Sequence, residues 1–159
     1  MSACTFFGHK NSLECIKKEL KDTIEHLILN DSVKTFYVGN NGSFDLYVYK
    51  VLKELKKSYA NIELFVVLAY VPENKDCTRY YSDSDSIYPD NLDKTPLRYH
   101  IDKRNRWMID HSDFVITHVL HTFGGAYKYA SLAKAKKKQS STFCEFKKFL
   151  LDKTFKFTY

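Results

Sequence analysis

Four short apolar runs alternate with longer amphipathic segments along this chain, and that alternation restricts the fold more than any other feature. The runs occupy residues 3–7, 33–38, 62–70 and 113–119. Each is a nearly continuous apolar run, as in strands of parallel sheets that are buried on both faces. Because regular alternation of strands and helices requires βαβ crossovers, the pattern predicts a three-layer, Rossmann-like, doubly wound α/β fold with a mainly parallel sheet.

Amphipathic periodicity predicts a helix after each of these strands. The expected helices span about 13–28, 44–58, 99–112 and 125–137. Two other segments do not follow the pattern. Residues 71–96 are polar and rich in turn-forming residues, which is typical either of a binding loop or of a solvated surface loop. The chain after residue 138 gives only weak strand and helix signals.

The composition favours a single domain over residues 1–159, because 44% of the residues are hydrophobic and can form a substantial core. The net charge of +6 favours anionic partners, but basic and acidic residues are interspersed, so nucleic-acid binding is only an alternative. The four cysteines lack metal or redox spacing, and the N-terminus lacks an apolar signal segment. We therefore expect reduced thiols, a cytoplasmic location and no membrane span.

Three predicted strands run directly into turns that contain glycine. The turn residues are Gly8, His9 and Lys10 after the first strand, Gly39, Asn40, Asn41 and Gly42 after the second, and Thr122, Gly124 and Gly125 after the fourth. In open parallel sheets, ligands bind beyond the carboxyl ends of the strands, and helix N-termini bind anions. One such turn is usually structural, but three at one edge predict a binding cleft with phosphate sites at Gly42 and Gly125.

The third predicted helix adds polar side chains to this edge. Arg104 and Asn105 fall on its core-facing side and in its N-terminal half, which lies near the carboxyl ends of the strands. Arg104 is therefore expected in the cleft, whereas Arg106 is out of phase and is expected to face solvent. The alternative is that Arg104 pairs with a buried acid such as Asp45 or Asp113, or caps strand carbonyl groups.

Several motifs together resemble one family. FFGHK, FYVGNNGSFD, VVLAYVP, RNRWMIDHSDFVI and GGAYKYA occur in the order and spacing of the YspA/YpsA-like branch of the SLOG (SMF/DprA-LOG) Rossmann superfamily, over about residues 5–138. The resemblance implies a doubly wound fold and a pocket for a nucleotide or a nucleotide-derived ligand, such as an ADP-ribose or NAD-like compound. It also implies a homodimer, and a role in sensing or processing such ligands, often in bacterial or phage conflict systems.

The same superfamily includes lonely-guy phosphoribohydrolases, which cleave the N-glycosidic bond of nucleotides. The RNRWM segment and the following Ser-Asp pair match their first motif, so the resemblance assigns the ligand-binding arginine to Arg104. Their glycine motif is only partly kept, because Gly124 and Gly125 are present but Ala130 stands where the catalytic glutamate is expected. An apolar methyl group cannot transfer a proton, so the catalytic carboxylate is missing unless another acid, Asp45 or Asp113, replaces it.

The sequence therefore predicts a protein that senses or sequesters a nucleotide-type ligand. Phosphates are expected at the glycine turns and at Arg104, and the base or ribose near Phe44, Asp45 and Asn105. The alternatives are an N-glycosidic hydrolase or transferase, and a DprA-like nucleic-acid-binding module. No metal site is predicted, because the histidines at 9, 118 and 121 lack a cysteine or acid that would complete a ligand set.

Overall fold

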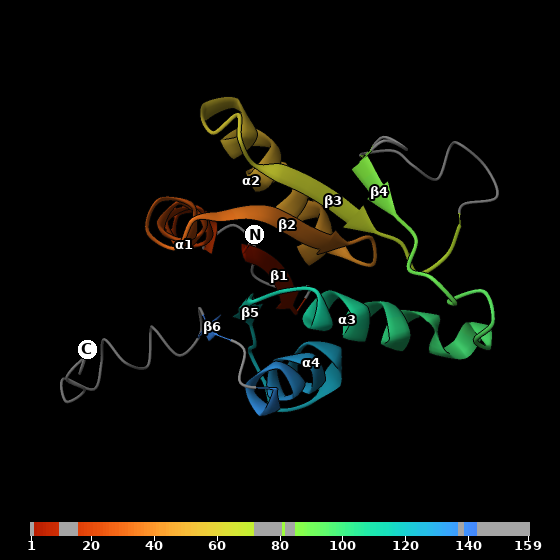
Figure 1. Ribbon diagram of the computed structural model, residues 1–159. Coiled ribbons are helices and arrows are strands. Elements are labelled where there is room, and N and C mark those ends of the chain that lie inside the picture. The colour runs from red at the N-terminus through yellow and green to blue at the C-terminus, as the bar shows by residue number, and fades with distance from the viewer. Residues whose placement is uncertain (1, 10–15, 72–80, 82–84, 137–138, 143–159) are drawn as a thin grey trace.

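In the computed structural model the chain forms a parallel sheet with helices on both faces (Figure 1). The structure describes residues 2–9, 16–71, 81, 85–136 and 139–142. The strands are β1 (Ser2–Gly8), β2 (Val33–Gly39), β3 (Glu63–Val67), β4 (Ser86–Ile87), β5 (Phe114–His118) and β6 (Gln139–Thr142). The helices are α1 (Lys17–Asn30), α2 (Ser43–Ser58), α3 (His100–Asp110) and α4 (Gly124–Ala135), with the short 3-10 helix η4 (Leu97–Tyr99) before α3.

The strands are ordered β4-β3-β2-β1-β5-β6, and every neighbouring pair is parallel. The chain therefore winds outward from β1 to β4, crosses back over the sheet through α3, and continues outward from β5 in the other direction. This reversal between β1 and β5 is the switch point at which doubly wound sheets bind ligands. The predicted fold class is confirmed.

Two strands lie where the sequence analysis placed no element. The predicted loop 71–96 contains β4, whose Ile87 pairs with Val67 of β3 and accepts a hydrogen bond from Leu68 N–H at 2.8 Å. The short segment after residue 138 forms β6, which extends the sheet beside β5. The first predicted helix began at residue 13, but α1 begins at Lys17, and residues 10–15 lie outside the described part of the chain.

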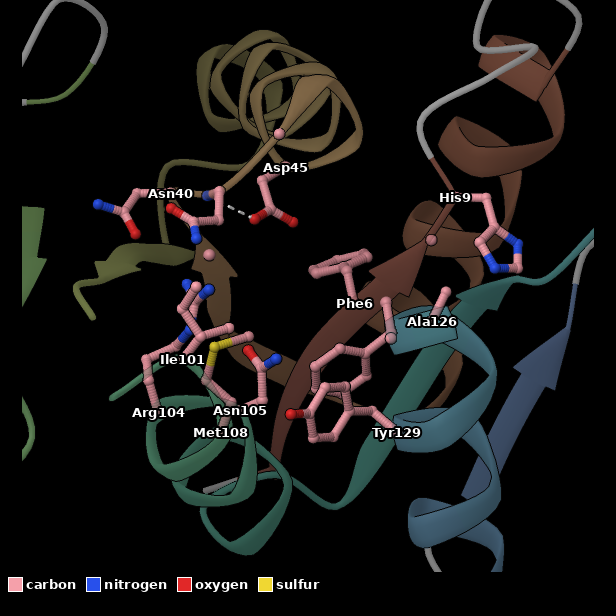
Figure 2. A pocket seen from close by; sticks show the side chains of 16 residues that line it. Phe6, His9, Asn40, Asp45, Ile101, Arg104, Asn105, Met108, Ala126 and Tyr129 are labelled. Carbon is pink, nitrogen blue, oxygen red and sulfur yellow. Dashed lines mark hydrogen bonds between the residues drawn. The ribbon is translucent and has the colours of Figure 1, made fainter. Parts of the chain in front are cut away.

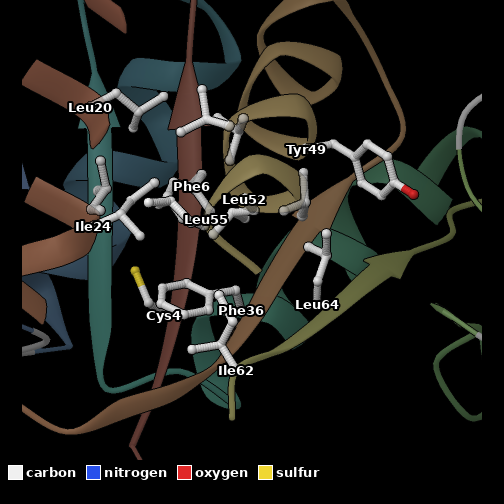
Figure 3. Packing of buried hydrophobic residues seen from close by; sticks show 14 of the residues in the cluster. Cys4, Phe6, Leu20, Ile24, Phe36, Tyr49, Leu52, Leu55, Ile62 and Leu64 are labelled. Atoms are coloured by element: carbon white, nitrogen blue, oxygen red, sulfur yellow. The ribbon is translucent and has the colours of Figure 1, made fainter. Parts of the chain in front are cut away.

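The sheet separates two hydrophobic clusters. The larger one packs α1 and α2 against one face of the sheet, with the rings of Phe6 and Phe36 stacked 6.2 Å apart at its centre (Figure 3). The smaller one packs Met108 and Ile109 of α3 and Ala133 of α4 against the other face. Each helix thus buries the apolar stripe that its sequence periodicity predicted, and α3 and α4 are held on the same side.

Cys4 is fully buried in the larger cluster and is a free thiol. Burial raises the pKa of this thiol well above its usual range, because the charged thiolate would lose its hydration. Cys4 therefore behaves as a small hydrophobic side chain, as expected. The predictions for Cys15, Cys77 and Cys144 fall outside the described residues. None of the helices within the described ranges has the length and apolarity needed to cross a lipid bilayer.

Candidate functional site

A cleft of about 720 Å³ lies at the carboxyl edge of the sheet, bounded by the ends of β1 and β2 and by α3 and α4 (Figure 2). Its volume falls within the range of small-molecule sites. The predicted site residues that line it are Gly8, His9, Gly39, Asn40, Asn41, Gly42, Asp45, Arg104, Asn105 and Gly125. The structure thus brings residues from three separate turns and from α3 to one cavity.

The other predicted site residues do not line this cleft. Phe44 is buried, and its ring packs against Gly8 and stacks on His118 at 6.1 Å, so it supports the end of β1 from beneath. Thr122 lies on the turn before α4 and Gly124 is the first residue of that helix; both are exposed and neither lines the cleft. Lys10 lies outside the described residues.

Arg104 and Arg106 lie on opposite sides of α3, as the helical phase predicted. The Arg104 side chain is almost completely buried, with 2% exposure, and faces the cleft. The Arg106 side chain is 46% exposed and donates from Nε to Asp102 one turn earlier. Phase on the helix therefore decides which arginine can reach a ligand.

Within the cleft, Arg104 has partners in the protein itself. Its Nη1 donates a hydrogen bond to the backbone oxygen of Val67 at 2.9 Å, at the carboxyl end of β3. Arg104 and Asp45 also meet directly over the Cα of Gly39, where a Cβ atom would collide with Nη1 of the first and Oδ2 of the second. Arg104 therefore caps a strand carbonyl group and lies beside an acid, as the alternative interpretation expected. It also lines the cleft.

Burial raises the pKa of the Asp45 carboxyl, while the charge of Arg104 and a hydrogen bond from the Asn41 backbone act in the opposite direction. That hydrogen bond is 2.9 Å long and runs from Asn41 N–H to Oδ2 of Asp45. Asp45 lies in the first turn of α2, so the β2–α2 turn already holds an acidic group of the protein.

The turn before α4 is different. Gly124 has a φ of +86°, a left-handed conformation that glycine adopts readily. The first turn of α4 carries no acidic residue, and within the described residues no side chain caps it. Gly125 and Ala126 bring this helix end to the cleft. The partial positive charge of the helix N-terminus therefore faces the cavity, and the first turn of α4 places no acidic side chain beside it.

His9 ties the β1 end of the cleft to the turn before α4. The backbone N–H of Leu120 donates to Nδ1 of His9 at 2.9 Å, so Nε2 carries the proton and donates to the oxygen of Phe123 at 3.2 Å. The ring of His9 stacks on that of His121 with centroids 3.7 Å apart, and the His121 ring packs on Phe123 in a tilted arrangement at 3.9 Å. These interactions give His9 a structural role, and no group of three potential metal ligands occurs within the described residues.

The two candidate acids lie at opposite edges of the sheet. Asp45 lines the cleft, whereas Asp113 precedes β5 and accepts a hydrogen bond from Ala3 N–H at 3.0 Å, at the amino end of the strands. Asp113 is therefore too distant to act as a relocated catalytic acid. Ala130 is buried within α4 and does not line the cleft.

Tyr129 lines the cleft but is absent from the sequence-based site. Its ring packs on Phe7 at 5.3 Å, and its hydroxyl donates to Asp102 at 2.9 Å. The Asp102 carboxylate also accepts from Arg106 Nε at 2.7 Å and pairs with Lys128, so it joins α3 to α4. Burial acts to raise the pKa of Asp102, but these three hydrogen bonds outweigh it and hold the pKa well below its usual range.

Asp102→Asn should lower the free energy of unfolding at neutral pH by about 1–2 kcal/mol, because hydrogen bonds to a charged acceptor are lost at a partly exposed site. A carboxyl whose pKa is lowered by folding contributes stability above its unfolded pKa, and loses it as the pH falls toward the folded value. Urea denaturation from pH 7 to pH 3 should therefore show the difference between the two proteins beginning to narrow below about pH 4. A constant difference across that range would contradict this role.

Comparison with known proteins places the chain in a family. The model of the YspA SLOG family matches residues 2–154, nearly the whole sequence and more than the segment 5–138 that carries the motifs. A comparison with curated proteins finds no match.

Proposed function

The chain belongs to the YspA SLOG family, and from that membership and the cleft we propose that it binds a nucleotide or a nucleotide-derived ligand such as an ADP-ribose compound. The observation that carries the proposal is a cavity at the switch point of a doubly wound sheet, where turns after β1 and β2 meet the N-terminal ends of α3 and α4. Polar backbone and side-chain groups converge there on one volume of nucleotide size.

The turn before α4 is the better of the two glycine turns for a phosphate. Backbone N–H groups at a helix N-terminus attract anions, and the first turn of α4 has no acidic residue, whereas Asp45 lies in the first turn of α2. Tyr129 forms an aromatic wall beside this position, and Arg104 provides a cation across the cleft. These charges favour an arrangement in which the phosphate lies at Gly125. The rest of the ligand then extends toward Asp45 and Asn105.

Thermal unfolding in the presence of a panel of nucleotides tests this proposal. AMP, ADP-ribose, NAD and cyclic nucleotides should be compared with inorganic phosphate at the same ionic strength. A ligand present at 100 times its Kd stabilises the folded state by about 2.7 kcal/mol, which corresponds to a rise of roughly 5 °C or more in Tm for a chain of this size. No stabilisation by any nucleotide would contradict the proposal.

The nucleic-acid alternative makes a different prediction in the same assay. An oligonucleotide bound through phosphates would stabilise the protein only above a minimum length and with a steep dependence on salt. A small ligand in the cleft should show neither property. Stabilisation by oligonucleotides and not by mononucleotides would therefore replace the proposed function with nucleic-acid binding.

Hydrolysis is the second candidate, because Asp45 is an acid that lines the cleft. We expect no efficient cleavage, since Ala130 replaces the glutamate of the hydrolases that the chain resembles and Asp45 already interacts with Arg104 and Asn41. The wild-type protein incubated with AMP should release adenine no faster than the Arg104→Ala variant does under the same conditions. Base release that depends on Arg104 would show that the protein is an enzyme.

A further inference from the structure

The turn between β2 and α2 carries hydrogen-bond acceptors beside the cleft. Asp45 places its carboxylate there, and the neighbouring Asn40 also lines the cavity (Figure 2). The Oδ1 atom of Asn40 is buried and has no hydrogen-bond partner within the described residues. A buried polar atom without a partner costs free energy, so this oxygen favours a ligand group that can donate.

A phosphate is the wrong chemical group for this turn. At neutral pH it carries acceptor oxygens and negative charge, so it would face the Asn40 oxygen and the Asp45 carboxylate without donating to either. Oδ2 of Asp45 also takes the Asn41 N–H that an incoming anion would use. The carboxylate of the protein thus occupies the anion-binding position of its own turn.

Arg104 fixes where this carboxylate lies. The guanidinium is bound to Val67 O and lies beside Asp45 above Gly39, while the Asn41 N–H donates to Oδ2 of Asp45. The carboxylate is therefore oriented before any ligand arrives. The Asp45 carboxylate and the Asn40 oxygen are thus two acceptors at one side of the cleft, and they match two donors that share one ligand group.

We propose that Asp45 is a specificity residue, which with Asn40 accepts hydrogen bonds from vicinal hydroxyl groups such as the 2′,3′-diol of a ribose and excludes phosphate from the β2–α2 turn. The diol assignment rests on the proposed function, and it gives the ligand a direction across the cleft. The ribose diol lies at α2, and the phosphate lies at the turn before α4.

Binding of inorganic pyrophosphate tests the exclusion of anions without any nucleotide. Asp45→Ala should bind pyrophosphate at least about tenfold more tightly than the wild type by calorimetry, because the Asn41 amide and the Arg104 charge become accessible to an anion. Glu54→Ala is the matched control, since Glu54 lies on the same helix, half exposed and paired with Lys21. It makes the same change in net charge and should bind like the wild type.

Asp45→Asn keeps the size of the side chain, removes its charge and turns one acceptor oxygen into a donor. It therefore decides the question if the alanine variant does not fold. It should also bind pyrophosphate more tightly than the wild type, although less tightly than Asp45→Ala. Unchanged pyrophosphate affinity in a folded Asp45 variant would overturn the exclusion of anions. An equal gain in Glu54→Ala would show that net charge alone is responsible, and would overturn it as well.

The diol is tested by comparing AMP with 2′,3′-dideoxy-AMP. The wild type should prefer AMP by about tenfold or more, the size expected for hydrogen bonds to a charged acceptor, and Asp45→Ala should lose most of this preference. Equal affinities in the wild type would overturn the assignment of the diol. If no nucleotide binds at all, the proposed function and the diol fail together, whereas the pyrophosphate result still decides whether Asp45 excludes anions.

Discussion

Arg104→Ala should weaken the binding of ADP-ribose, or of whichever nucleotide stabilises the protein most, by roughly thirtyfold to over one hundredfold, which is ~2–3 kcal/mol. Two effects act in the same direction. The cleft loses a buried cation that faces it, and the Asp45 carboxylate loses the neighbour whose charge compensates it. Removal of the Arg104 charge also raises the pKa of Asp45 further, since that charge opposes the effect of burial.

Arg104→Lys should restore little of this affinity. A lysine ammonium is a compact point charge, whereas the planar guanidinium reaches Val67 O and Asp45 at once. Arg106→Ala is the control, because Arg106 is about half exposed on the other side of α3 and should change affinity far less. Calorimetry on the folded variants measures the effect, and wild-type affinity in Arg104→Ala would contradict the prediction.

A double-mutant cycle with Asp45→Asn separates the two effects. If the guanidinium contacts a phosphate directly, Arg104→Ala loses most of its affinity in the Asp45→Asn background as well. If Arg104 acts mainly by neutralising and orienting Asp45, the loss largely disappears when the carboxylate is already absent. The cycle therefore shows whether the arginine acts on the ligand or through its neighbour.

The fold was predictable because its signals are local and strong. Strands β1, β2, β3 and β5 are buried on both faces and read as nearly continuous apolar runs, and each helix carries one apolar stripe. The two-residue strand β4 has no such signal, because it is too short for periodicity and forms only by pairing with β3. Its place in the sheet depends on contacts that are distant in sequence.

The candidate site was predictable where topology alone determines position. The turns at Gly39 and Gly125 reach the cleft because parallel strands end at the same edge, and Arg104 reaches it by helical phase. Phe44 begins an apolar stripe that continues at Val48, so its periodicity already indicated a core position. Tyr129 has the sequence pattern of a core aromatic residue, and its contact with Asp102 could not be read from the sequence.

A side chain at Gly39, at the carboxyl end of β2, would require Arg104 and Asp45 to shift. Arg104 and Asp45 meet over the Cα of Gly39, and neither can move away easily, because Arg104 is bound to Val67 O and Asp45 to Asn41 N–H. Gly39→Ala should therefore separate this pair or displace the end of the strand. Overpacking of a buried site and separation of Arg104 from Asp45 together predict a loss of roughly 2–4 kcal/mol in the free energy of unfolding.

Gly125→Ala is the matched control for stability. The nearest atom to a Cβ at Gly125 is Cε2 of Tyr129, at an ordinary contact distance of 3.9 Å, and alanine is the better helix former. This variant should be as stable as the wild type or slightly more so in urea denaturation, whereas Gly39→Ala should unfold at a clearly lower urea concentration. Equal stability of the two variants would show that the Arg104–Asp45 pair does not need the space above Gly39, and would remove the close contact on which the orientation of Asp45 depends.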